Sequence, residues 1–317
     1  MNRRTFFKTL AAGGAALATA EAAAPRSAEA AKQRVELATV LDLTQCIGCG
    51  ACVEACRDAN AAKKPEPQKP FPKMYPARVK AEDWSDRRDV DDRLTPYNWL
   101  YIQTAQVEVD GEMQDIYIPR RCLHCVNPPC ANLCPWGAAL KQENGIVRIN
   151  DDICLGGSKC KAVCPWHIPQ RQTGVGLYLD LLPAFAGNGV MYKCDRCYDR
   201  VADGGVPACI EVCPMQVQTI GPRDDMLALA HARAEEIGGY IYGEHENGGT
   251  NTLYVSPVPF ETLAEAVETG PGRPHLGPAQ DVMAKDEALA RAVVVSPLVG
   301  IAAGVLTFAA AMKKGDS

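Results

Sequence analysis

The sequence predicts an α+β fold in which two small modules are interleaved along the chain. Three observations lead to this prediction. The 317 residues include 15 cysteines, and all of them fall in four short runs. Short alternating apolar stretches with turn signals lie near the runs, which predicts strands. The stretch 223–237 has helical periodicity and predicts a helix after the last run. Helices and strands in separate parts of the chain are typical of the α+β class.

The composition is that of a folded globular protein. It is 47% hydrophobic and 22% charged, which excludes collagen-like, disordered and coiled-coil classes and suggests one or two folded units. The formal net charge of -5 would oppose general binding to nucleic acid. We therefore expect no nucleic-acid partner.

Residues 1–30 have the features of an export signal. Arg3 and Arg4 precede Thr-Phe-Phe-Lys, an Ala- and Gly-rich stretch spans 10–20, and small residues near Ala24 and Ala30 provide cleavage sites. Adjacent arginines indicate the twin-arginine route, which carries proteins that fold and take up cofactors before crossing the membrane. A general secretory signal is the alternative. Either route places the mature protein in the periplasm.

The other end of the chain predicts a membrane anchor. The 21 residues 292–312 carry no formal charge, and Lys313 and Lys314 follow them. A helix of that length measures about 32 Å, close to the hydrocarbon thickness of about 30 Å. We expect one transmembrane helix with the two lysines on the cytoplasmic side. A buried core helix is the alternative.

The spacing of the cysteines predicts iron-sulfur clusters. The successive runs read C-x2-C-x2-C-x3-C, C-x2-C-x4-C-x3-C, C-x5-C-x3-C and C-x2-C-x11-C-x3-C. Closely spaced thiolates from one loop can hold a cubane cluster, while the last cysteine of a run reaches the neighbouring cluster. Zinc would explain a C-x2-C pair but not four such repeats, and the odd number of cysteines weakens a disulfide scaffold.

The segment between the second and third runs indicates how the runs pair. It reads as two strands around Asn144-Gly145, the hairpin that joins the halves of a two-cluster ferredoxin. The second and third runs therefore form one ferredoxin-like module over 119–184. The first and fourth runs form the other, over 38–56 plus 185–222.

Cross-ligation within each pair of runs predicts four ligand sets. They are Cys46, Cys49, Cys52 and Cys213 for cluster 1; Cys56, Cys194, Cys197 and Cys209 for cluster 2; Cys122, Cys125, Cys130 and Cys164 for cluster 3; and Cys134, Cys154 and Cys160 for cluster 4.

The fourth set lacks a thiolate because Gly157 stands where the third run should carry its second cysteine. Three thiolates suit a 3Fe-4S cluster, so we expect three 4Fe-4S clusters and one 3Fe-4S cluster. The alternative is a fourth 4Fe-4S cluster completed by water, Ser158 or Asp152. A 3Fe-4S centre typically has the higher reduction potential, which suits exchange with quinone.

The rest of the chain adds connections and no catalytic constellation. The insertion 57–118 ends in a predicted hairpin around Asp110-Gly111, and an extension and linker spans 223–291. The early part of the insertion is either a solvated loop or a surface for a larger partner. The histidines are scattered, without a triad or a metal pattern. Since clusters ligated by cysteine only pass electrons, we expect a non-enzymatic subunit.

The motifs CIGCGACVEAC, CLHCVNPPCANLCP, NGIVRINDD, KCDRC and GGVPACIEVCP resemble those of the four-cluster ferredoxin subunits of membrane-bound oxidoreductases. The sequence is most similar to the subunit of hydrogenase-2-type enzymes and next to the beta subunit of periplasmic formate dehydrogenases. At Gly157 the sequence departs from both patterns and resembles nitrate reductase beta subunits, which also lack a cysteine at that position.

The resemblance implies a linear wire between a catalytic subunit and a membrane quinone-reactive subunit or cytochrome, with the three-cysteine site at the membrane end. It leaves open a quinol-oxidising reductase with reverse electron flow. A stand-alone redox enzyme would need a flavin, molybdenum or nickel motif, and the sequence contains none that we recognise.

Overall fold

The computed structural model describes residues 35–74, 76–185 and 187–284. The predicted leader 1–30 and the predicted span 292–312 lie outside these ranges. Within them, no helix has the length and apolar character needed to cross a membrane.

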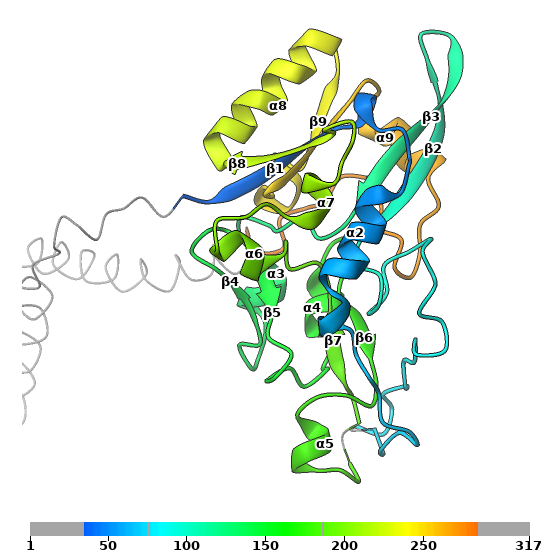
Figure 1. Ribbon diagram of the computed structural model, residues 1–317, viewed down its shortest axis with the longest axis vertical. Coiled ribbons are helices and arrows are strands. Elements are labelled where there is room, and N and C mark those ends of the chain that lie inside the picture. Colours follow the sequence, from blue (N-terminus) through cyan, green and yellow to red (C-terminus); the bar gives the residue numbers. More distant parts are fainter. Residues whose placement is uncertain (1–34, 75, 186, 285–317) are drawn as a thin grey trace, which may run out of the picture. The chain divides into compact units, whose positions relative to one another are not determined.

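The elements, shown in Figure 1, are β1 (Leu37–Asp42), η1 (Leu43–Gln45), α2 (Ala51–Ala59), η2 (Ala61–Lys63), β2 (Tyr101–Val109), β3 (Glu112–Arg120), α3 (Pro129–Asn132), β4 (Ala139–Lys141), β5 (Val147–Ile149), α4 (Lys159–Val163), β6 (Gln170–Gln172), α5 (Tyr178–Leu181), β7 (Val190–Tyr192), α6 (Tyr198–Ala202), α7 (Ala208–Glu211), β8 (Gln218–Pro222), α8 (Arg223–Ile237), β9 (Tyr240–Tyr242), η3 (Glu246–Gly248), β10 (Thr252–Ser256) and α9 (Phe260–Ala266).

The largest sheet has the strand order β8-β1-β10-β9. β1 pairs with β8 in the antiparallel sense and with β10 in the parallel sense. Strands that flank the first and fourth cysteine runs are therefore neighbours. Since β9, β10 and α8 come from the C-terminal extension, that stretch shares a sheet with strands next to these two runs.

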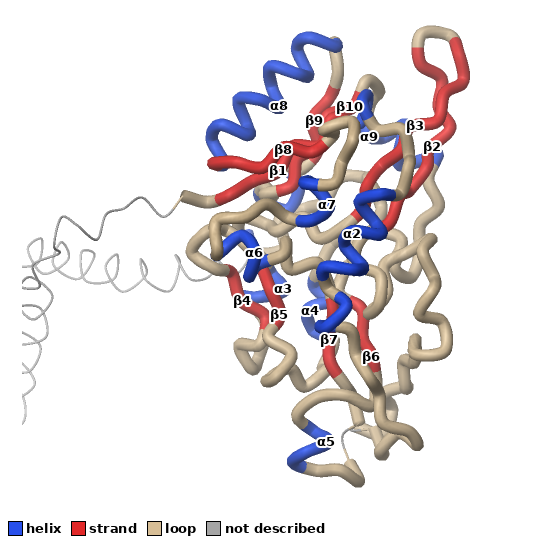
Figure 2. The backbone as a smooth tube through the Cα atoms, in the orientation of Figure 1, coloured by secondary structure: helices blue, strands red, loops and turns tan. Residues whose placement is uncertain are grey.

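The alternation of residues along β1 and β10 gives the sheet two apolar faces. Val40 and Leu253 pack with Ala230 of α8 in one small core. Leu41 and Tyr254 point the other way, into the larger core that contains most of the cysteines. Figure 2 shows α8 over this sheet, while short elements and long loops form the cysteine-rich part.

A repeated local structure accompanies the cysteines. In each run, the cysteine before the last one is the second residue of a helix. These cysteines are Cys52 in α2, Cys130 in α3, Cys160 in α4 and Cys209 in α7. Helix α2 packs against α7, and α3 packs against α4. The first run is thus next to the fourth, and the second is next to the third.

Three elements expected from the sequence are confirmed. Strands β2 and β3 pair around Asp110 and Gly111, both with positive φ as a type I′ turn requires. Strands β4 and β5 form the hairpin between the second and third runs. Helix α8 covers Arg223–Ile237.

The early part of the insertion packs on its own chain. The backbone amide of Gln68 donates to the carbonyl of Gly174, and that of Thr173 donates to Glu82, at 2.8 and 2.9 Å. The side chain of Glu82 also pairs with Arg171 at 2.8 Å. These contacts hold parts of the loop against the segment that follows the third run.

The Gly- and Pro-rich stretch 270–280, part of the segment 223–291 expected to be an extension and linker, also packs against the protein. Leu276 is buried, the Tyr242 hydroxyl donates to the carbonyl of Gly277 at 2.9 Å, and Arg120 donates to that of His275 at 2.8 Å.

Substitution of Gly189 tests the packing around β6 and β7, and Gly111 in the turn between β2 and β3 is the control. Both have positive φ, but a Cβ at Gly189 would lie 1.7 Å from the Gln172 carbonyl oxygen, whereas one at Gly111 would meet nothing within 4 Å. We expect Gly189→Ala to lower the free energy of unfolding by more than about 3 kcal/mol and Gly111→Ala by about 1 kcal/mol. Urea unfolding followed by circular dichroism measures both. Equal losses would contradict the described crowding.

Candidate iron-sulfur sites

Each cysteine run begins with the same turn. The residue two positions after the first cysteine has a positive φ in all four runs: 68° at Gly48, 49° at His124, 62° at Gly156 and 55° at Arg196. In each case its backbone N–H donates to the sulfur of that first cysteine. The turn therefore aims amides at sulfur, a contact that tunes iron-sulfur centres.

Two cavities are each lined by four cysteines from two different runs. Cys46, Cys49, Cys52 and Cys213 line the first cavity, together with apolar residues such as Ile102 and Val217. These are the thiols that the sequence analysis assigns to cluster 1. Cys49 is exposed, so this cavity reaches the surface.

The second cavity holds the thiols assigned to cluster 3. Cys122, Cys125, Cys130 and Cys164 line this cavity, together with side chains that include Trp166 and Ile168. Trp166 is 2% exposed, and its indole N–H donates to the Tyr242 hydroxyl at 2.7 Å. Tyr242 therefore holds one wall of this cavity in place, and its hydroxyl also donates to Gly277 of the 270–280 stretch.

The remaining thiols also gather in two groups. Burial, and then the neighbouring Cys194, Cys209 and Cys197 thiols, raise the pKa of Cys56 well above its ordinary value. Burial, and then the thiols of Cys130, Cys154 and Cys134, raise the pKa of Cys160. Of these, Cys130 lines the second cavity, so three cysteines remain for the second group, while four meet in the first.

All 15 cysteines are free thiols, and among the described residues no three potential ligands converge as they would around a single metal ion. The ligands of a polynuclear cluster stand around a space larger than a single ion, as the cysteines of the two cavities do.

Burial makes these thiols poor anions unless metal is bound. It raises the pKa of Cys52 to about 12 and that of Cys194 to about 12. At neutral pH both are protonated without metal, so binding iron must release their protons. Occupation of the sites is therefore coupled to deprotonation.

Three buried basic side chains near the thiols escaped the sequence analysis: Arg121, Lys193 and Arg196. Nη1 of Arg121 donates to Sγ of Cys209 at 2.8 Å, while its Nε and Nη2 have no hydrogen-bond partner. Such orphaned cationic groups fit a bound anionic cluster. In the sequence, two of these residues could have been identified because a basic residue stands immediately before Cys122 and before Cys194.

His124 is buried and uncharged. Burial, and then the neighbouring cations, lower its pKa well below the ordinary value. Its Nδ1 accepts the backbone N–H of Val147 at 3.0 Å. This matches the ordinary structural role expected from the scattered histidines.

The third run keeps the cluster-binding turn although Gly157 carries no thiol. Positive φ occurs at Gly156 and Ser158, as it does at Gly48 and Gly50 of the first run. A Cβ on Gly157 would meet nothing within 4 Å. The backbone therefore does not require glycine here, and the missing ligand is a property of the side chain alone.

Ser158 and Asp152, the two alternative protein ligands for the fourth centre, lie in different surroundings. The Ser158 hydroxyl lies 3.4 Å from the carbonyl oxygen of Gly156 and 3.4 Å from Sδ of Met191. Asp152 is exposed, with its backbone N–H donating to Asn150. Neither contact engages one of the three thiols of this group.

Comparisons with known proteins agree with this arrangement. Sequence models described as 4Fe-4S dicluster domains match residues 45–138 and 113–223. The chain is 31% identical to the hydrogenase-2 operon protein HybA of Escherichia coli O157:H7 over 303 residues, covering 83% of each protein.

Two further relatives are shorter matches. The iron-sulfur subunit of nitrate-inducible formate dehydrogenase of Escherichia coli K12 is 29% identical, covering 70% of this chain and 68% of the relative. A component of anaerobic dimethyl sulfoxide reductase from the same strain is 32% identical, covering 59% and 73%. The cysteine turns, the dicluster domains and these relatives together show that this protein is a member of the family of ferredoxin-type iron-sulfur subunits of oxidoreductases.

Proposed function

We propose that this protein carries electrons between a periplasmic catalytic subunit and a quinone-reactive subunit or cytochrome in the membrane, without making or breaking substrate bonds itself. The observation that carries the proposal is the succession of thiol groups through the core. Cys52 of the first group lies within electrostatic range of Cys209 of the second. Cys194 faces Cys122, and Cys160 faces Cys130.

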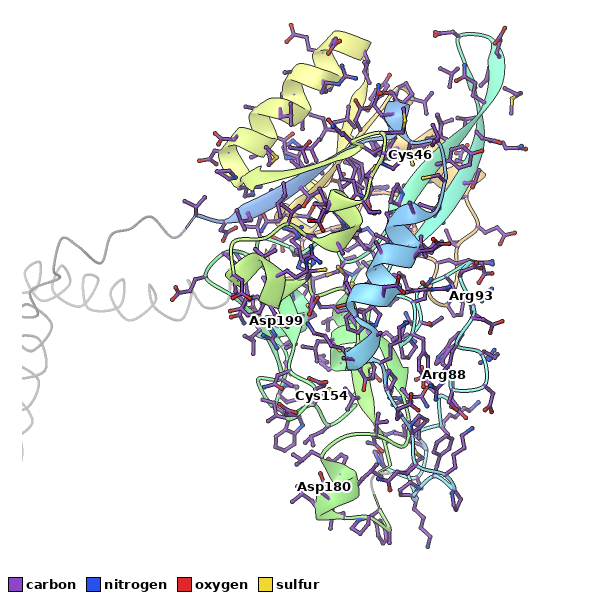
Figure 3. All side chains as sticks on the ribbon, in the orientation of Figure 1. Cys46, Arg88, Arg93, Cys154, Asp180 and Asp199 are labelled. Carbon is purple, nitrogen blue, oxygen red and sulfur yellow. The ribbon has the colours of Figure 1, made fainter. Side chains whose placement is uncertain are left out.

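These contacts support a linear order from cluster 1 to cluster 4. The proposed ligands are Cys46, Cys49, Cys52 and Cys213; Cys56, Cys194, Cys197 and Cys209; Cys122, Cys125, Cys130 and Cys164; and Cys134, Cys154 and Cys160 for a 3Fe-4S centre. Bound there, iron-sulfur clusters accept and release single electrons. In Figure 3, Cys46 lies near the base of β2 and β3, far from Cys154 towards the α5 end.

The protein's own residues would insulate this path. Trp166, Ile168 and Val147 exclude water around the proposed third centre, and the amides of the repeated turns donate to sulfur. The protein thereby keeps the second and third centres away from solvent, while the first reaches the surface at Cys49 and the substrate is handled elsewhere.

The relatives support a choice of partner enzyme and of electron direction. HybA and the formate dehydrogenase subunit favour a hydrogenase or a molybdenum or tungsten enzyme as electron donor, with two electrons leaving the substrate and entering quinone. The dimethyl sulfoxide reductase relative favours the opposite direction, from quinol to an oxidised substrate. We propose the first direction because the HybA match covers more of the sequence.

Iron analysis tests the proposal directly. Three 4Fe-4S clusters and one 3Fe-4S cluster require about 15 iron atoms per chain, with a similar amount of sulfide. We expect this content in protein purified without oxygen, and electron paramagnetic resonance signals of both cluster types. Metal-free protein with its thiols oxidised to disulfides would contradict the proposal.

Replacing Gly157 by cysteine tests the type of the fourth centre. The open space at this position accepts the new side chain. We expect Gly157→Cys to abolish the 3Fe-4S signal of the oxidised protein, raise the iron content by about one atom and lower the potential of that centre. Gly157→Ala is the control and should keep the signal. A wild-type protein without a 3Fe-4S signal would favour four 4Fe-4S clusters.

The leader is tested by changing both arginines. If residues 1–30 direct the twin-arginine route, replacing Arg3 and Arg4 by lysine removes the recognised pair while keeping the charge. We expect the protein to accumulate in the cytoplasm, as measured by fractionation and immunoblotting. Changing Lys8 to arginine should leave export intact. Normal export of the double variant would contradict the leader assignment.

A further inference from the structure

Arg121 is a buried cation to which the described residues offer no carboxylate partner. Its side chain is 2% exposed, and only Nη1 has a hydrogen-bond partner, the Cys209 sulfur. No carboxylate pairs with it in the described part of the chain. Removing a charge from water costs several kcal/mol unless an opposite charge compensates. The fold must therefore place negative charge beside this guanidinium.

The groups beside Arg121 are thiols of two neighbouring ligand sets, which become thiolates when a cluster binds. Besides Cys209, the guanidinium interacts electrostatically with Cys194 and with Cys52. Cys52 belongs to the first proposed ligand set, and the other two belong to the second. Arg121 thus lies at the junction of clusters 1 and 2.

Lys193 occupies the next junction in the same way. Its side chain is buried, and Nζ donates to the carbonyls of Val147 and Cys194 at 2.5 and 3.0 Å. It interacts electrostatically with Cys122 and Cys130 of the third set and with Cys194 of the second. No carboxylate pairs with it among the residues that the structure describes.

Two other buried arginines have partners that are not thiols. Arg171 pairs with Glu82 at 2.8 Å. Arg120 also has no hydrogen-bond partner at Nε and Nη1, but it stacks over Tyr254, 5.5 Å from the ring centroid, and donates to the carbonyl of His275.

Arg196 is a third buried cation beside the thiols, and it donates to the carbonyls of Leu37 and Asn251 and to the Thr252 hydroxyl. At the proposed fourth centre, the carboxylate of Asp151 lies near Cys154. The buried cations beside thiols are therefore concentrated at the first two junctions.

We propose that Arg121 and Lys193 are charge-compensating residues, one at each of the first two junctions between clusters, that raise the reduction potentials of the centres on both sides. The proposal rests on the ligand sets of the proposed function. A cluster that accepts an electron gains one negative charge, and a fixed positive charge in a low-dielectric interior stabilises that reduced form. Both residues act through the cluster ligands, so they are positioning residues.

The test compares reduction potentials in the full-length protein, assembled with its native partners. Redox titration followed by electron paramagnetic resonance measures each centre in wild type, Arg121→Met and Lys193→Met. We expect Arg121→Met to lower the potentials of clusters 1 and 2, and Lys193→Met those of clusters 2 and 3. The potential of the three-cysteine centre should change least in both variants.

Two further variants separate charge from packing. Arg121→Lys keeps the charge, so its potentials should lie between those of wild type and Arg121→Met. Arg120→Met removes the adjacent buried arginine, whose contacts are with carbonyls and Tyr254. It should lower the midpoint of thermal unfolding and leave all potentials unchanged.

The outcomes also distinguish this inference from the proposed function. Unchanged potentials in Arg121→Met and Lys193→Met, with a full iron content, would overturn the inference and leave the clusters in place. Wild-type protein without iron would overturn the proposed function itself. If Arg121→Met loses its iron, Arg121→Lys decides: retained iron with potentials near wild type supports the charge role, and an equal loss of iron contradicts it.

Discussion

The convergence of buried sulfur atoms is the constraint on which the rest of the structure depends. The thiols come from four runs spread over residues 46–213, and most of them lie in the larger core. Without metal, burial keeps thiols such as Cys52 and Cys194 protonated, with the pKa of each raised to about 12. A core built around protonated thiols and cavities lacks the contacts that a packed interior normally supplies. The bound clusters would supply these contacts, so folding and cofactor uptake are coupled in this account.

Two devices bring the sulfurs together. A turn with positive φ follows the first cysteine of each run, and a short helix begins next to the third. The helix pairs α2–α7 and α3–α4 then fix which runs are neighbours. The four-stranded sheet and α8 pack behind one half of this assembly, and the insertion packs on the other. Most of the secondary structure therefore serves to hold loops in place.

Local sequence signals predicted much of this structure, and the cysteine spacing predicted that the first and fourth runs are neighbours, whereas other long-range contacts were missed. Asp110-Gly111 and Asn144-Gly145 identify their hairpins because the turn chemistry is local, and the periodicity of 223–237 identifies α8 for the same reason. The parallel pairing of β1 with β10 was not predicted, since it joins residues about 200 positions apart. Arg121 and Lys193 were missed because a basic residue beside a cysteine looks solvent-exposed until the fold buries it. The contacts of the 270–280 stretch have no local signal either.

A map of anomalous scattering at the iron absorption edge, from crystals of the full-length protein prepared without oxygen, tests the central claim most directly. The account predicts four separate peaks in a row, each within bonding distance of one of the proposed sets of sulfurs, with only three thiolates at the last. Fewer peaks, or peaks bound to thiols from different sets, would contradict it.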